Sequence, residues 1–74
     1  MSNERANDLA QLCTERVSKG DEFPIIWSTV LKRHPLVNGI PQQRLEGNRA
    51  LLDIPLITGE RLVFDGDTRK FRVE

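Results

Sequence analysis

The apolar residues of this chain change their spacing once, near Asn38-Gly39. Before that point they recur every three or four residues, which is the spacing of an amphipathic helix. After it they recur close to every second residue, which is the spacing of a half-buried strand. The change predicts a helical first half and a β second half, and residues 1–74 suffice for one domain.

Two helices are predicted in the first half, over residues 4–19 and 22–33. The first has an apolar stripe, an expected cap at Ser2 or Asn3, and an expected end at Gly20. The second has the more regular stripe, which is the clearest amphipathic pattern in the chain. That stripe consists of Phe23, Ile26, Trp27, Val30, Leu31 and His34.

Four strands are predicted in the second half, separated by turns that contain Gly47-Asn48, Gly59 and Gly66. The expected strand ranges are 42–46, 49–56, 61–65 and 70–74. Because each turn is short, consecutive strands should pair as an antiparallel meander. The predicted fold is therefore an α+β domain of order ααββββ, with two helices packed on one face of the sheet.

The turn lengths predict which residues pair across the sheet. A two-residue first turn pairs Leu45 with Ala50. A three-residue second turn pairs Ile54 with Phe64, and a four-residue third turn pairs Phe64 with Phe71. The helices should then cover an apolar face formed by Leu45, Ala50, Leu52, Ile54, Leu56, Leu62, Phe64, Phe71 and Val73.

The opposite face of the sheet carries basic and acidic side chains, which predicts a solvated outer surface. Two apolar residues, Leu51 and Val63, interrupt it. The registers predict cross-strand ion pairs between Glu46 and Arg49, between Asp65 and Lys70, and between Arg61 and Glu74.

Composition excludes several classes of function. Eleven Lys and Arg balance 11 Asp and Glu, so the basic excess typical of nucleic-acid or anionic-lipid binding is missing. The longest uncharged segment has ten residues, whereas a membrane helix needs about 20, so we expect no membrane contact. One Cys and one His cannot supply a structural zinc site, so we expect no metal and no cofactor. A lone thiol without a secretory signal predicts a cytoplasmic protein.

The residues that most often carry chemistry have structural explanations here. His34 is predicted to end a helix, and Cys13 lies in the apolar stripe of the first helix. Asp65-Gly66-Asp67 has the composition of a hairpin turn and lacks the further ligands of a calcium loop. Neither a nucleophile–base constellation nor a glycine-rich phosphate loop is visible, so we expect no enzyme and no catalytic residue.

The remaining prediction is a small non-enzymatic cytoplasmic protein that acts as a protein–protein interaction module. Its partner would be another protein or a second copy of itself. The candidate partner-binding residues are Leu36, Val37, Ile40, Leu51 and Val63. The alternative is weak nucleic-acid binding by a basic cluster of Lys32, Arg33, His34, Arg69, Lys70 and Arg72. Salt distinguishes the two, because phosphate binding weakens steeply as salt rises and apolar contacts do not.

Overall fold

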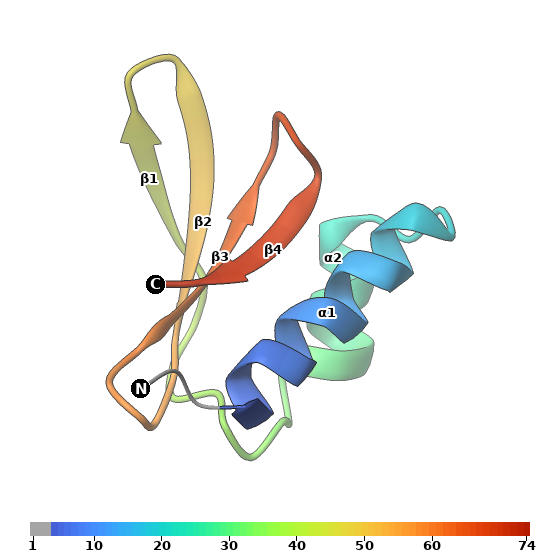
Figure 1. The fold of residues 1–74 in the computed structure, drawn as a ribbon, viewed down its shortest axis with the longest axis vertical. Helices are drawn as coiled ribbons and strands as arrows, with labels where there is room; N and C mark the ends of the chain where they lie inside the picture. Colours follow the sequence, from blue (N-terminus) through green and yellow to red (C-terminus); the bar gives the residue numbers. More distant parts are fainter. Residues whose placement is uncertain (1–3) are drawn as a thin grey trace.

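In the computed structural model, which describes residues 4–74, a four-stranded antiparallel sheet packs against two helices (Figure 1). The helices are α1 (Glu4–Ser18) and α2 (Phe23–Ile26), which continues as the π-helix η1 (Trp27–Leu31). The strands are β1 (Gln42–Glu46), β2 (Arg49–Pro55), β3 (Arg61–Asp65) and β4 (Lys70–Val73). They lie in the order β1-β2-β3-β4, so the α+β class and the meander are confirmed. The predicted caps Ser2 and Asn3 lie outside the described residues.

Helix α1 ends in a Schellman motif close to the predicted position. The N–H of Gly20, whose φ is 103°, bonds to the carbonyl of Val17 at 3.0 Å. The N–H of Asp21 bonds to the carbonyl of Arg16 at 3.0 Å, which completes the motif. The predicted apolar stripe is buried, and consists of Ala6, Leu9, Ala10, Cys13 and Val17.

The second helix is shorter than predicted, because it ends at Leu31 and its second half is wound as a π-helix. The N–H of Lys32 bonds to the carbonyl of Trp27, five residues back, at 2.8 Å. The chain then turns, and the N–H of Leu36 donates to Nδ1 of His34 at 3.1 Å. The stripe still faces the core, with Ile26 and Leu31 buried and Phe23, Trp27 and Val30 partly buried.

The first and third turns have the predicted registers. Leu45 pairs with Ala50, and Phe64 pairs with Phe71. In the first turn Gly47 has a φ of 64° and the following residue does not have a positive φ, as in a type II′ turn.

The second register is wrong by two residues, because Leu56 does not belong to β2. Ile54 pairs with Leu62 instead of Phe64, and five residues separate the two strands. Leu56 instead forms an isolated bridge with Val37, in the segment that connects the helices to β1. The connecting segment therefore lies alongside the end of β2, where the N–H of Asn38 donates to the carbonyl of Pro55 at 2.8 Å.

The core lies between the helices and the helix-facing side of the sheet. Helix α1 contacts the sheet mainly through the edge strand β4. The N–H of Phe71 donates to Oγ1 of Thr14 at 2.9 Å, and the Thr14 hydroxyl donates to the carbonyl of Ala10 at 2.9 Å. The rings of Phe23, Phe64 and Phe71 meet with centroids 4.8–6.1 Å apart.

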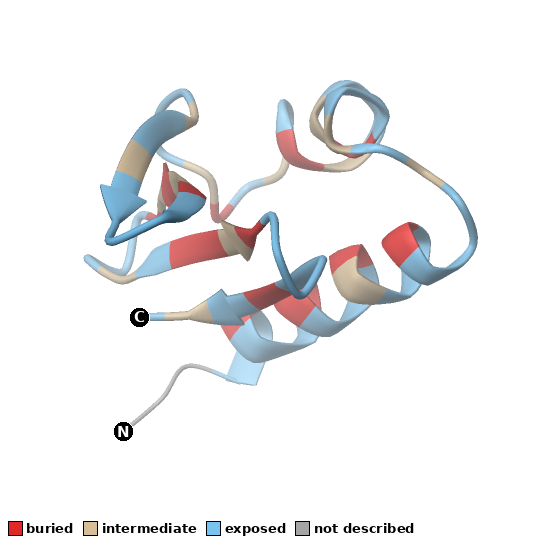
Figure 2. Ribbon diagram, turned by 90° about the horizontal axis from the view of Figure 1, so that it is seen from above, coloured by how far each residue is buried: buried red, intermediate tan, exposed pale blue. Residues whose placement is uncertain are grey.

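The helices leave the β1–β2 hairpin uncovered. Leu45 is 72% exposed and Ala50 is exposed, although both lie on the same face of the sheet as the buried Ile54. Figure 2 shows the exposed residues at the end of this hairpin. The prediction that the helices cover the whole apolar face is wrong here, because α1 lies beside β4, at the other edge of the sheet.

Candidate functional site

The five apolar residues predicted to bind a partner do not form an exposed patch. Leu36 packs into the core, and Leu51 and Val63 are 1% and 0% exposed. Val37 is partly buried, and Ile40 alone of the five is largely exposed, at 69%. The expectation of surface exposure is therefore wrong for Leu36, Leu51 and Val63.

Leu51 and Val63 lie on the outer face of the sheet, away from the helices, and arginine side chains explain their burial. Both residues belong to central strands. Leu51 lies opposite Arg44 of β1, and Val63 lies opposite Arg72 of β4. The aliphatic part of an arginine shields an apolar neighbour while its guanidinium group stays at the surface. The alternating pattern assigned Leu51 and Val63 to the correct face. The charged residues on that face did not indicate that arginine side chains would shield these two residues from solvent.

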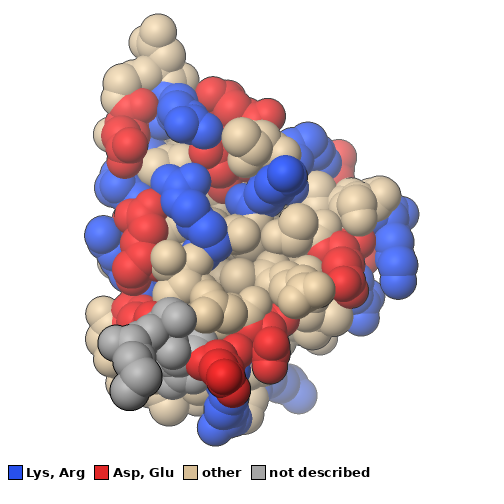
Figure 3. All heavy atoms as spheres, in the orientation of Figure 1, with Lys and Arg blue, Asp and Glu red and all other residues tan. Residues whose placement is uncertain are grey.

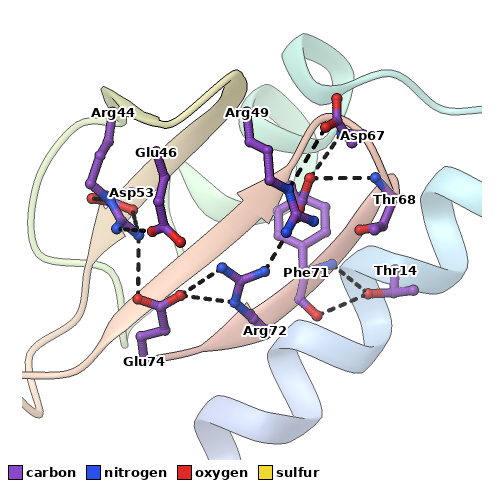
Figure 4. Close-up of polar contacts among 11 residues, drawn as sticks. Thr14, Arg44, Glu46, Arg49, Asp53, Asp67, Thr68, Phe71, Arg72 and Glu74 are labelled. Atoms are coloured by element: carbon purple, nitrogen blue, oxygen red, sulfur yellow. Dashed lines mark hydrogen bonds and ion pairs between the residues drawn. The ribbon is translucent and has the colours of Figure 1, made fainter.

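Carboxylates hold the guanidinium groups in place over this face (Figure 4). Arg44 donates from Nε to Asp53 Oδ2 at 2.8 Å and from Nη1 to Glu46 Oε2 at 2.9 Å. Arg72 donates from Nε to Glu74 Oε2 at 2.8 Å. Glu74 also lies 3.3 Å from Arg44, so the two groups of ion pairs form one network across the sheet.

Asp65 is the buried member of this network, with a fully buried carboxylate. Its Oδ1 accepts from the N–H of Asp67 at 2.9 Å and from the N–H of Thr68 at 3.4 Å. Its Oδ2 accepts from Arg49, and from Arg72 at 3.4 Å. Burial by itself raises the pKa of Asp65, but these donors outweigh it, so the pKa lies below its ordinary value.

The network differs from the predicted ion pairs. Arg61 and Glu74 do pair, at 3.7 Å. Glu46 pairs with Arg44 of its own strand, and Asp65 pairs with Arg49 and Arg72, because long arginine side chains reach beyond the residue directly opposite. Within residues 4–74 every buried side-chain nitrogen or oxygen has a hydrogen-bond partner, which is typical of a structural network.

Cys13 has the buried position that its structural explanation requires, whereas His34 lies beyond the end of the second helix at Leu31 and does not end it as predicted. Cys13 is fully buried, and burial raises the pKa of its thiol to about 12, although Arg16 opposes the shift. His34 is half-buried and lines a shallow pocket of about 250 Å³, together with Arg5, Asp8, Leu9 and Leu12. In the described part of the chain no three His, Cys, Asp or Glu residues are grouped as metal ligands.

The six candidate nucleic-acid-binding residues do not converge. In Figure 1 the turn that contains Arg69 lies near the top, and the chain leaves the second helix, near Lys32 and Arg33, well below it. Arg72 is held by Asp65 and Glu74. Figure 3 shows basic and acidic side chains interspersed over the visible face, without a large patch of one sign.

The β1–β2 hairpin carries the exposed features that the sequence analysis missed. Strand β1 is an edge strand, and Leu45 is its one large apolar side chain. The residues that flank a two-residue turn form a hydrogen-bonded pair, which here is Glu46 with Arg49. Because the pattern alternates along β1, Gln43 and Leu45 direct their backbone N–H and C=O groups away from the sheet. The predicted meander order already placed β1 at an edge of the sheet, and this order was the sequence feature that could have indicated the exposed strand.

None of the helices within residues 4–74 is long and apolar enough to cross a membrane. Comparisons with protein-family models, with curated proteins and with solved structures found no match to this chain.

Proposed function

We propose that this chain is a small non-enzymatic cytoplasmic protein that acts as a protein–protein interaction module, and that the β1–β2 hairpin is its binding surface. The exposure of Leu45 carries the proposal, because 72% of this residue faces solvent on the face that elsewhere forms the core. An apolar side chain beside an unpaired strand edge is a common site of protein binding.

The backbone of β1 supports the same proposal. A free edge strand offers a row of N–H and C=O groups to an added strand. Proteins often block such an edge with Lys, Pro or a bulge. Strand β1 contains neither Lys nor Pro, and its pairing with β2 is continuous from Gln42 to Glu46. Pro41 precedes the strand and leaves the edge formed by Gln43 and Leu45 open.

Site-specific photo-cross-linking in living cells that express the protein tests the proposal. A photoreactive phenylalanine analogue would replace Leu45, and in a control it would replace Gln11, which is exposed on α1. We expect protein adducts from position 45, and few from position 11. Equal labelling from both positions would contradict the proposed surface.

A second experiment, an NMR titration with DNA, tests the nucleic-acid alternative. Amide NMR spectra with a short mixed-sequence duplex at low salt would then show shifts near Lys32 and near Arg69 that reverse as salt is added. Such shifts, without protein adducts from position 45, would replace the proposed function by the nucleic-acid alternative.

A further inference from the structure

We propose that the partner strand at the β1 edge is β1 of a second copy of this chain, paired antiparallel so that Leu45 faces Leu45. The inference rests on the proposed function, because it names the occupant of the same surface. The sheet of such a dimer would have eight strands, with the two β1 strands at its centre. Helix α1 packs against β4 at the opposite edge of each sheet, so it does not obstruct this pairing (Figure 1).

The backbone restricts the registers that two β1 strands can adopt. The groups of Gln43 and Leu45 point away from β2 and are available to a second copy. A symmetric antiparallel pair that uses them must be centred on Gln43, on Arg44 or on Leu45. These three registers differ in the side chains that they bring opposite each other.

Two of the registers have a clear defect. Centring on Arg44 places the two Arg44 side chains directly opposite each other, and like charges in that position are destabilising. Centring on Gln43 places Leu45 opposite Pro41, whose nitrogen carries no hydrogen to donate.

The third register is complementary in both charge and polarity. Centring on Leu45 places Arg44 opposite Glu46 of the second copy, and symmetry repeats this pair. Both residues lie on the outer face, where Arg44 already bonds to Glu46 of its own chain at 2.9 Å. On the other face the two Leu45 side chains meet and remove each other from water.

The remaining electrostatics permit the association. The chain has a formal net charge of zero, so two copies do not repel each other at long range. The shared edge is five residues long, which is small compared with a standard protein interface. We therefore expect a reversible dimer whose population rises with concentration.

Cysteine scanning tests both the dimer and its register. Single cysteines would replace Gln43, Arg44 or Leu45 in a Cys13→Ala background, so that the native thiol cannot contribute. Under mild oxidation we expect a disulfide-linked dimer to form at least tenfold faster from position 45 than from position 43 or 44. A fastest reaction at position 43 or 44 would overturn the proposed register.

Sedimentation velocity over a range of concentrations tests the dimer without cross-linking. We expect the weight-average mass of the wild type to rise toward twice the chain mass. Leu45→Lys should remain a monomer at every concentration, because it places two ammonium groups opposite each other. Leu12→Lys is the matched control, since Leu12 is an exposed leucine on α1, and it should dimerise like the wild type.

The outcomes separate this inference from the proposed function. A wild type that stays monomeric at its highest soluble concentration overturns the dimer. If photo-cross-linking from position 45 then captures a different protein, the proposed function still stands. If position 45 yields adducts neither to a second copy nor to another protein, both proposals fail.

Discussion

At the scale of single residues, Asp65 shows how the outer face of the sheet tolerates a buried charge. A carboxylate removed from water must be matched by hydrogen bonds and by opposite charge. The N–H groups of Asp67 and Thr68 and the guanidinium groups of Arg49 and Arg72 provide both. The carboxylate thereby joins the β3–β4 turn to β2 and β4, and it stabilises the turn as well as the face.

The Asp65 carboxylate should make stability depend on acid. Folding lowers the pKa of Asp65. The ionised carboxylate therefore stabilises the fold above the pKa of Asp in the unfolded chain, about 3.9, and this stabilisation is lost as pH falls through the pKa of Asp65 in the folded protein. We expect Asp65→Asn to lower Tm at neutral pH and to reduce the drop in Tm on acidification below about pH 4. Circular dichroism melts at a series of pH values would measure both. Asp67→Asn is the control, because its exposed side chain makes one long ion pair at 3.7 Å.

Arg69 is the one described residue other than glycine with a positive φ, 57°, and it closes the β3–β4 turn. Side chains disfavour this backbone conformation by about 1 kcal/mol or more, and glycine does not. Glycine loses more conformational entropy on folding than arginine, which offsets part of the relief of strain. We therefore expect Arg69→Gly to increase the free energy of unfolding by about 0.5–1 kcal/mol. Urea denaturation would measure the change. Arg69→Ala keeps the strain, so an equal gain from both variants would assign the effect to the side chain instead.

At the scale of the elements, the two edges of the sheet are treated differently. At the β4 edge, Thr14 of α1 accepts the N–H of Phe71, which points away from β3. The helix therefore protects this edge from another strand while it covers the core. At the β1 edge no described residue has this role for Gln43 or Leu45. The asymmetry leaves one edge of the sheet available for binding.

Loss of the Thr14 hydroxyl should weaken the contact between α1 and β4. Thr14→Val keeps the shape of the side chain but leaves the N–H of Phe71 without its acceptor. We expect a loss of about 1–2 kcal/mol in the free energy of unfolding, and faster exchange of the Phe71 amide. Thr29→Val is the matched control, because the exposed Thr29 hydroxyl bonds only to the carbonyl of Ile25, at 2.7 Å within its own helix. Similar losses in the two variants would show that the contact with β4 adds nothing.

At the scale of the whole molecule, the apolar pattern predicts the faces of the sheet but not what covers them. Leu45 lies on the predicted inner face and is exposed, whereas Leu51 lies on the predicted outer face and is buried. Cover depends on where the helices end and how far arginine side chains reach, and both follow from contacts between residues distant in sequence. The isolated bridge between Leu56 and Val37 has the same origin. The turn at Gly47 was predictable because neighbouring residues determine it.

The candidate surface was predictable from the sequence only in part. The connection between the second helix and β1 did contain one exposed apolar residue, Ile40, but Leu36 in the same segment joined the core. Position along the chain does not distinguish these two residues, because their exposure depends on how the segment lies against Pro55 and Leu56. The exposure of Leu45 required the spatial position of α1, which the sequence pattern does not contain.

Because the helices cover the centre of the sheet and leave the β1–β2 hairpin exposed, the hairpin should open more easily than the core. Amide hydrogen exchange in dilute protein can measure this difference. Ile54 and Leu62 pair at the centre of the core, so their amides should exchange only when the whole domain unfolds. Arg44 bonds to β2 but lies in a strand with no buried residue, so its amide should exchange faster, through local opening of the hairpin. The amide of Leu45 points away from the sheet and should exchange fastest of the four. If Arg44 were protected as strongly as Ile54, the hairpin would open only with the core. Rapid exchange at Leu45 in dilute protein that slows as concentration rises would show that a second copy supplies the missing acceptor.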